Sequence, residues 1–417
     1  MVQGRWRRAA VIAVSAAFMT LAVACSTDAP QADATTETTP APASTEAPTP
    51  ATAPTENSPI STPPVASGAD DFSYVDLLRF IPDVPSMRDG EVWIGNVPAA
   101  EADAGVSFPL VTDTPFPWDD YAAYLELLPD GTDPVFFERN GSFGDDDERL
   151  AELAVSSLGF GPPHVDQWVY ALPLAGFNLP FYVALGPFAQ QSILTHLESC
   201  ALCAAADASF AYEGWEVRAW GEEGDIGIHQ RLRWQPPFYD SLGRGGRLAF
   251  RDGVVARTLL IDQLQGVVQA DAGEIPSLAD LPEWRAMAER LDQIGAYSAY
   301  VTNYPFDPLG RDGKLHTEGP FIDAYLLFAS VFATEPSDGL PVRALVLYES
   351  EEDALDNADR LRERAAANYD ERLLYDVQVS IDGAFVIMRY SPPKIDGFQR
   401  DQDYLIRHLI AMKPGSP

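Results

Sequence analysis

Positive charge is scarce in this chain. Its 417 residues include 28 Lys or Arg against 62 Asp or Glu, which gives a formal net charge of −34 at pH 7. The lysines are Lys314, Lys394 and Lys413, so the remaining basic residues are arginines. A surface this acidic keeps a protein soluble and repels nucleic acid and anionic lipid headgroups. We therefore exclude nucleic acid as a partner.

Long apolar runs are also scarce. The run that stands out begins at Ala9, behind three arginines, and ends in the small residues Ala22-Val23-Ala24. It is too short to span a bilayer comfortably, and no later segment reaches the roughly 18 uncharged apolar residues of a transmembrane helix. A basic start, an apolar middle and small residues at the cut are the parts of an export signal. We expect residues 1–24 to be a signal peptide that is removed.

Cysteine is rare, and the first of the three cysteines lies at the cut, in Leu21-Ala22-Val23-Ala24-Cys25. This stretch resembles the lipobox of bacterial lipoproteins. The resemblance implies lipid on Cys25 and an anchor on the extracytoplasmic face of the cell membrane. Ala22-Val23-Ala24 also fits an ordinary A-x-A cleavage site, which would give a secreted protein without lipid on Cys25. We expect the anchored form, with the membrane as a partner through Cys25.

The other two cysteines are Cys200 and Cys203. If Cys25 carries lipid, they remain as a pair in an exported protein, so we expect a structural disulfide between them or a buried thiol pair. A redox role is disfavoured because the pair follows a predicted helix, whereas a reactive thiol sits at a helix N-terminus. His196 would add a third zinc ligand, but a structural zinc site requires a fourth, and no fourth ligand is recognisable. We assign no metal site.

The stretch from Ser26 to Asp70 consists mainly of Ala, Thr, Pro, Ser and Glu, with no aromatic residue, Lys or Arg. Such a segment cannot bury enough apolar surface to offset the entropy cost of ordering. We expect residues 25–71 to be a disordered Pro/Thr/Ala-rich tether. An ordered body should follow, divided into an N-terminal α+β domain over 72–302 and a C-terminal α+β unit over 303–417 that packs on it.

Strand and helix patterns alternate along this body. Short β-prone runs flank Asp-Gly at 252–253 and again at 382–383, which is the strongest short-range hairpin signal. The order strand, helix, strand, Asp-Gly, strand occurs around 181–257 and again around 342–390, which suggests a duplicated strand-helix-hairpin unit. We predict an α+β fold with antiparallel sheets and helices packed on one face.

The second copy has the clearest helix signals. Ser350 is placed to cap a helix, and three acidic residues in its first turn and three arginines near its end agree with the helix dipole. The apolar stripe of this helix is predicted as Leu355, Ala358 and Leu361. Tyr404–Met412 is predicted as a closing amphipathic helix.

Catalytic signatures are absent from the sequence. It contains no Gly-x-Ser-x-Gly elbow, HExxH, Walker loop or Rossmann glycine pattern. We interpret the five histidines as ordinary core or surface residues: His164, His196, His229, His316 and His408. Acidic clusters are interpreted as solvated surface; they lie at 119–120, 145–148, 222–225 and 351–353. We assign no catalytic residue and no cofactor.

Three Pro-aromatic loops remain: Phe116-Pro117-Trp118, Trp234–Tyr239 and Tyr304-Pro305-Phe306. Exposed aromatic residues on rigid loops contact glycans or partner proteins, whereas packed ones cover the core. We favour packing for these loops.

The opening Leu77-Leu78-Arg79-Phe80-Ile81-Pro82-Asp83 and the strand-helix-hairpin modules resemble uncharacterised bacterial lipoproteins with no assigned activity, with actinobacteria as a suggested source. The resemblance carries no catalytic residues across. We hypothesise a lipid-anchored cell-envelope protein with a non-enzymatic binding or assembly role, whose partner is an envelope protein or glycan. The alternatives are an envelope-acting hydrolase of glycans or esters, which would use carboxylates or a histidine, and a carrier of an apolar ligand.

Overall fold

The body of the protein is built on β-strands, which the computed structural model describes together with the helices that cover them. The described residues are 73–111, 115–129, 146–174, 179–200, 206–223, 238, 244–304, 320–334, 340–367, 375–391 and 410. The strands are β1 Glu91–Asn96, β2 Gln167–Leu172, β3 Phe181–Leu185, β4 Ala208–Tyr212, β5 Trp215–Ala219, β6 Arg247–Arg251, β7 Val254–Thr258, β8 Ala296–Thr302, β9 Leu327–Ala333, β10 Val342–Leu347, β11 Tyr375–Asp382 and β12 Phe385–Ser391.

Short helices connect the strands. They are α1 Tyr74–Leu78, α2 Pro85–Arg88, α3 Val97–Ala104, α4 Trp118–Leu125, α5 Asp146–Leu158, α6 Gln190–Ser199, α7 Ile261–Asp271, α8 Pro282–Gln293 and α9 Glu351–Ala367, with single 3₁₀ turns η3 at Pro162–His164 and η5 at Leu278–Asp280. In the part of the chain that the structure describes, none of these helices is long and apolar enough to cross a membrane.

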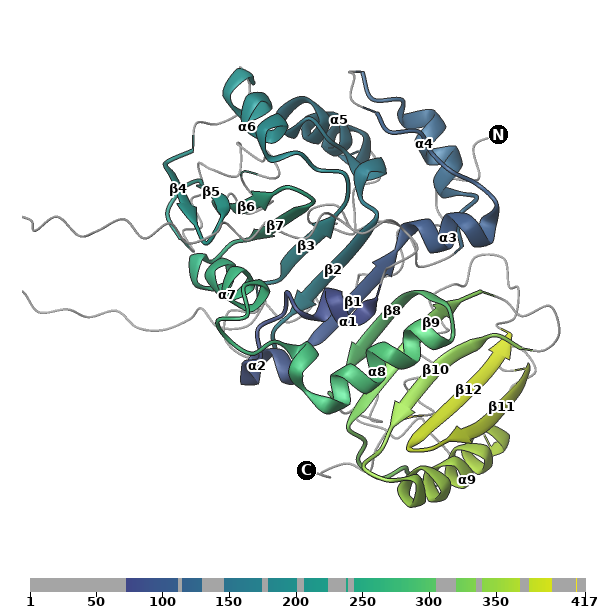
Figure 1. Cartoon of the computed structure of the whole chain (residues 1–417). Coiled ribbons are helices and arrows are strands. Elements are labelled where there is room, and N and C mark those ends of the chain that lie inside the picture. Colours follow the sequence, from purple (N-terminus) through teal and green to yellow (C-terminus); the bar gives the residue numbers. More distant parts are fainter. Residues whose placement is uncertain are drawn as a thin grey trace, which may run out of the picture. The chain divides into compact units, whose positions relative to one another are not determined.

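The twelve described strands form one sheet in the order β11-β12-β10-β9-β8-β1-β2-β3-β7-β6-β5-β4 (Figure 1). Every neighbouring pair is antiparallel. The α+β class and the antiparallel pairing predicted from the sequence are confirmed. Asp252-Gly253 joins β6 to β7 and Asp382-Gly383 joins β11 to β12, with both glycines at positive φ, as tight hairpin turns require.

Helices cover both faces of this sheet, which corrects the expectation of helices on one face. On one face, α1, α7 and α8 share a core with the strands from β1 to β10 other than β4, and with β12. On the other face, α5 and α6 pack against β2, β3, β6 and β7, while α9 packs against β9, β10 and β12. The physical reason is that β7 and β8 are buried along their whole length, so both of their faces need cover.

The predicted duplication is visible in the topology. In the first copy, β3 leads through α6 to the β6–β7 hairpin, and β7 returns to pair with β3. In the second copy, β10 leads through α9 to the β11–β12 hairpin, and β12 returns to pair with β10. The first copy carries an extra hairpin, β4–β5, beyond β6. Between the two copies the sheet continues through β9, β8, β1 and β2, and Trp93 of β1 lies opposite Tyr300 of β8.

The predicted boundary between residues 302 and 303 falls at the end of β8. That strand pairs with β1 on one side and with β9 on the other. All described residues belong to one compact unit.

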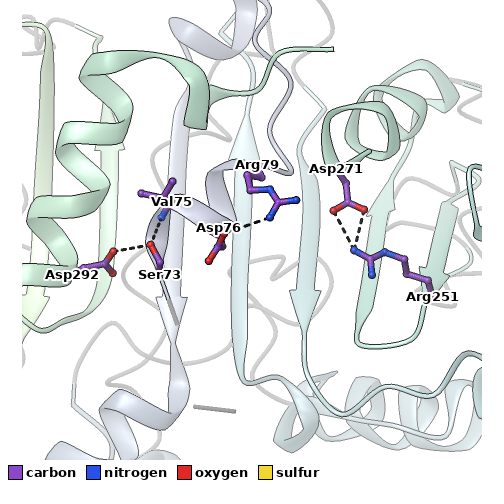
Figure 2. Close-up of polar contacts among 7 residues, drawn as sticks. All are labelled: Ser73, Val75, Asp76, Arg79, Arg251, Asp271 and Asp292. Carbon is purple, nitrogen blue, oxygen red and sulfur yellow. Dashed lines mark hydrogen bonds and ion pairs between the residues drawn. The ribbon is translucent and has the colours of Figure 1, made fainter. Parts of the chain in front are cut away.

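Helix α1 is tied to α8 by a shared cap (Figure 2). Ser73 Oγ accepts a hydrogen bond from the Val75 backbone N–H at 3.1 Å and donates one to Asp292 Oδ2 at 3.0 Å. Burial raises the pKa of Asp292 above its usual value. On the same face, Arg251 of β6 pairs with Asp271 of α7 at 3.0 Å (Figure 2). These contacts hold the helices on the sheet from both halves of the chain.

Helix α9 begins as predicted at its cap. Ser350 Oγ accepts a hydrogen bond from the Asp353 backbone N–H at 3.1 Å and donates one to Asp353 Oδ2 at 2.6 Å. The predicted apolar stripe is wrong at one position, because Leu355 is 51% exposed. The buried residues of α9 are Ala354, Asn357, Ala358, Leu361 and Arg364. They follow the i, i+3, i+4, i+7 spacing of one helix face, and Leu355 lies off that face.

Some predicted features lie outside the described residues. They are the signal peptide 1–24, the tether 25–71, Cys25, Cys203, His229, His316, His408, most of the Trp234–Tyr239 loop, Pro305-Phe306, and the closing helix 404–412 apart from Ile410. Ile410 is buried in the core under α9.

Candidate functional site

The candidate site forms where β1 ends and α3 begins. Asn96, the last residue of β1, caps α3 with its side chain, which accepts a hydrogen bond from the Ala99 N–H at 3.1 Å. Asn is among the residues preferred at this position, and Pro98 follows in the first turn, where its missing N–H is harmless. The cap fixes the direction in which α3 leaves the sheet and therefore where Glu101, one turn along, is placed.

Asp166 lies beside the same strand end, just before β2. Its backbone C=O accepts a hydrogen bond from the Val97 N–H at 2.8 Å, and its own N–H donates to the Leu185 C=O at 2.9 Å. These two bonds continue the ladders on either side of β2, since β1 and β3 are its neighbours in the sheet. Asp166 is therefore held by backbone contacts on both sides while its side chain stays free to face α3.

Between α3, α4 and η3 lies a cavity of about 100 Å³. Its walls are aromatic rings, prolines, aliphatic side chains and two carboxylates; the lining residues are Val97, Pro98, Glu101, Phe108, Leu110, Tyr121, Tyr124, Pro162, Pro163, Val165 and Asp166. No Ser, Thr, Cys, His, Lys or Arg occurs among these described lining residues. We call this space the α3–α4 cavity.

Glu101 is positioned by two neutral donors. Its Oε1 accepts a hydrogen bond from the Phe108 backbone N–H at 3.0 Å and another from the Tyr124 hydroxyl at 2.8 Å. Hydrogen bonds to a charged acceptor are shorter and stronger than neutral ones. Glu101 therefore ties α3 to the segment after it and to α4, and this holds the two helices around the cavity.

Asp166 differs from Glu101 because no described residue donates a hydrogen bond or an ion pair to its carboxylate. Burial raises the pKa of Asp166 from the usual 3.8 to about 6, and the negative charge of Glu101 adds to the shift. Both causes disfavour the charged form. The two carboxylates thus line the same cavity. Glu101 accepts two hydrogen bonds, whereas Asp166 accepts none from the described residues.

Three aromatic rings form one wall. The ring centroids of Phe108 lie 5.1 Å from Tyr121 and 5.2 Å from Tyr124, and those of the two tyrosines are 5.7 Å apart. Tyr182 of β3 is fully buried nearby, and this burial, together with Tyr121, raises its pKa well above the usual value. Such packed rings give the cavity a rigid wall with electron-rich faces.

The cysteine and zinc predictions meet at the end of α6. Cys200 is the C-cap residue of α6 and is disulfide-bonded, while Cys203 lies outside the described residues. The ring of His196 packs on Gly159, and its Nδ1 lies 2.8 Å from the Ser192 carbonyl oxygen. Within the described ranges, no group of three or more His, Cys, Asp or Glu side chains is arranged to hold a metal ion.

The other sequence candidates are not gathered at the cavity. His164 of η3 is buried, burial lowers its pKa, and its Nδ1 accepts a hydrogen bond from the Gly161 N–H at 3.2 Å. The described acidic clusters at 119–120, 222–223 and 351–353 are exposed, as expected for solvated surface. Of the Pro-aromatic loops, Phe116 and Phe238 are buried, whereas Tyr304 is 44% exposed.

Sequence reasoning missed Glu101 and Asp166. Neither belongs to an acidic cluster, because Glu101 sits in an alanine-rich helix and Asp166 follows Pro-Pro-His-Val. The available signal was a lone acid directly before a buried strand, which is too common to select one residue among 62 acids. Only the pairing of β2 with β1 brings the two carboxylates together.

The raised pKa of Asp166 predicts a pH-dependent gain in stability for Asp166→Asn. The folded-state pKa of about 6 exceeds the usual 3.8, so the charged side chain destabilises the fold above pH 6 and this penalty disappears as the pH falls from 6 to 4. After allowance for solvent screening, we expect the variant to have a free energy of unfolding about 1 kcal/mol higher at pH 7.5. Urea unfolding at pH 7.5 and pH 4 measures it.

Asp103→Asn is the matched control for this prediction. Asp103 lies on the same helix as Glu101 but is exposed and does not line the cavity. We expect its free energy of unfolding to stay within about 0.5 kcal/mol of the wild type at both pH values. Equal shifts for the two variants, or a gain for Asp166→Asn that persists at pH 4, would contradict the assignment.

In comparisons with known proteins, no family model, no curated protein and no solved structure matches this chain. Function is therefore inferred from the geometry and chemistry of the cavity.

Proposed function

We propose that this protein is an exported, lipid-anchored component of the cell envelope that binds a small molecule, or a small group of a larger one, in the α3–α4 cavity without transforming it. The observation that carries the proposal is the carboxylate of Asp166 at the wall of a preformed cavity, to which no residue in the described ranges donates a hydrogen bond. The export signal and the lipobox-like stretch ending at Cys25 supply the location on the extracytoplasmic face of the membrane.

The energetics of Asp166 support a binding role. Taking a carboxylate out of water without a compensating partner costs folding free energy, so such groups are rare unless they serve a function. Glu101 increases this cost because its charge faces the same cavity. A ligand that complements the carboxylates would remove the penalty in the bound state.

Nucleophilic catalysis is not favoured by the lining residues. A Ser, Cys, Thr or Lys nucleophile is activated by a base within hydrogen-bonding reach or by a lowered pKa. The described lining of the cavity contains none of these residue types. A carrier of an apolar ligand is also less favoured, since two carboxylates would have to be buried against that ligand.

A carboxylate hydrolase is the second candidate, because one observation favours it. Asp166, with a pKa of about 6, lies near Glu101, and two carboxyl groups in different environments can serve as acid and base in glycoside hydrolysis. Against this reading, the cavity of about 100 Å³ is smaller than the roughly 300–1,000 Å³ of typical pockets for larger ligands. It accommodates a group of a few atoms rather than a chain of sugars.

Blocking the cavity mouth tests the proposed function. Leu110 lines the cavity yet is 56% exposed, so Leu110→Trp should narrow the entrance without disturbing the core. We expect small cationic, anionic and neutral test compounds, screened by ligand-observed NMR, to include binders that the wild type retains and Leu110→Trp loses by at least about tenfold in affinity, or 1.4 kcal/mol.

Leu127→Trp serves as the control, because Leu127 is 62% exposed and does not line the cavity. It should bind like the wild type. Absence of any bound compound, or equal binding to Leu110→Trp, would count against the proposal. Hydrolysis of model glycosides or esters by the wild type, abolished in Asp166→Asn, would instead support the second candidate.

A further inference from the structure

The two carboxylates of the α3–α4 cavity face it without a positive partner. Among the residues that line it in the described chain, none is Lys, Arg or His. The hydrogen-bond donors to Glu101 are a backbone N–H and a hydroxyl, both neutral, and Asp166 has no described donor. Among the described lining residues, none carries a positive charge that would neutralise the two carboxylates.

The same cavity is also lined by aromatic rings, which suit one class of ligand. Phe108, Tyr121 and Tyr124 present a cluster of three rings with centroids 5.1–5.7 Å apart. The faces of aromatic rings attract cations that carry little bound water, such as alkylammonium groups. A cation placed in this space would have both carboxylates and aromatic rings among its neighbours.

We propose that the α3–α4 cavity binds an organic ammonium group, with Glu101 and Asp166 as its charge partners and Phe108, Tyr121 and Tyr124 as its aromatic wall. This inference rests on the proposed binding function and gives it a ligand class. The space suits the class: about 100 Å³ is several times the 10–15 Å³ or so that a single water molecule needs, and a short alkylammonium has only a few heavy atoms.

A metal ion fits the cavity less well. Ca²⁺ takes roughly six to eight oxygen ligands at close range. The described lining offers two carboxylates and two tyrosine hydroxyls, one of which already donates to Glu101, and its remaining side chains are hydrocarbon. An organic cation can contact both the carboxylates and the hydrocarbon side chains, whereas a hard divalent ion is bound only by the oxygen atoms.

Binding should depend on pH through Asp166. The titratable groups that face it are Glu101 from α3 and Tyr121 and Tyr124 from α4, with the buried His164 on its own segment. Asp166 is charged above a pH of about 6 and neutral below it. Because a neutral carboxyl group attracts a cation less, affinity should be highest above pH 6 and fall as the pH is lowered.

The test compares n-butylammonium with n-butanol, its neutral counterpart, by ligand-observed NMR titration of the full chain. At pH 7.5 we expect n-butylammonium to bind at least about tenfold more tightly than n-butanol. Its affinity should fall about tenfold between pH 7.5 and pH 5, as expected for loss of one charge with a pKa near 6. Asp166→Asn should weaken the preference, because Glu101 remains as a charge partner, and should remove the fall in affinity between pH 7.5 and pH 5. Asp103→Asn should retain both.

Equal binding of the amine and the alcohol, or a preference that is undiminished in Asp166→Asn, would overturn the ammonium assignment and leave the proposed function intact if Leu110→Trp still blocks binding. Displacement of n-butylammonium by micromolar Ca²⁺ would overturn it in favour of a metal site.

A second titration, with Nα-acetyl-lysine methylamide, distinguishes the source of the ammonium group. Binding of both amines indicates a site open to a lysine of another protein, and binding of n-butylammonium alone indicates a free amine.

Discussion

The Cys25→Ser variant is expected to leave the membrane fraction and accumulate in the medium. In the proposed anchor the lipid is attached through the sulfur of Cys25, and a serine hydroxyl does not substitute for that thiol. Each buried CH₂ of a lipid chain contributes about 0.8 kcal/mol to membrane binding, so loss of the chains removes the anchor. Ala22-Val23-Ala24 remains as an ordinary cleavage site, so export itself should continue. Cell fractionation followed by immunoblotting measures the shift.

Ser26→Ala is the matched control, because it changes the neighbouring residue and keeps the cysteine. It should stay with the membrane, and its intact mass should carry the lipid. A Cys25→Ser protein that remains membrane-bound would show that the anchor lies elsewhere in the chain. A full-length protein that stays inside the cell with residues 1–24 still attached would contradict the assignment of these residues as an export signal.

The Gly186→Ala variant is expected to lose about 3 kcal/mol of unfolding free energy, at the upper end of overpacking costs. Gly186 directly follows β3, and a Cβ atom there would lie 1.9 Å from the carbonyl oxygen of His164. Because the obstacle is backbone, it cannot swing aside as a side chain would. The segment from His164 to Asp166 would have to move away from β3, which should also weaken binding in the α3–α4 cavity.

Gly266→Ala is the control for this prediction, and we expect it to keep or raise stability by up to about 1 kcal/mol. Gly266 lies inside α7, and its added Cβ would meet Pro82 at 3.4 Å, an ordinary contact. Alanine is also the better helix former. Guanidinium unfolding of both variants measures the difference. If Gly186→Ala keeps the unfolding free energy of the wild type, Gly186 does not approach the His164 carbonyl oxygen closely enough for an added Cβ atom to clash.

Much of the local structure was predictable because its causes are local. The Asp-Gly turns at 252–253 and 382–383 were read directly from residue types that favour positive φ. The cap at Ser350 was recognisable because the acceptor and the N–H it satisfies are three residues apart. Cys200 at the end of α6 followed from the helix pattern before it.

Two predictions were wrong, the buried face of α9 and the placing of helices on one face of the sheet. Both features depend on packing between segments that are distant in sequence. Leu355 is apolar and lies near a helical stripe, but the sheet meets α9 on the face of Ala354 and Ala358, whose small side chains allow close approach. The helix cover on both faces depends on strands such as β8, whose tyrosine and serine residues are buried although their side chains are polar.

By itself, the sequence determined the α+β class, the hairpins, the helix caps and the repeated order of elements, because periodicity, turn residues and caps act over a few neighbouring residues. The joining of the two copies through the four strands between them, and the placing of Glu101 beside Asp166, were decided only by the tertiary structure. Both depend on strand pairing between segments far apart in the chain, and the energy of that pairing is shared across the whole sheet. The cavity is thus a property of the assembled sheet, and no short stretch of sequence specifies it.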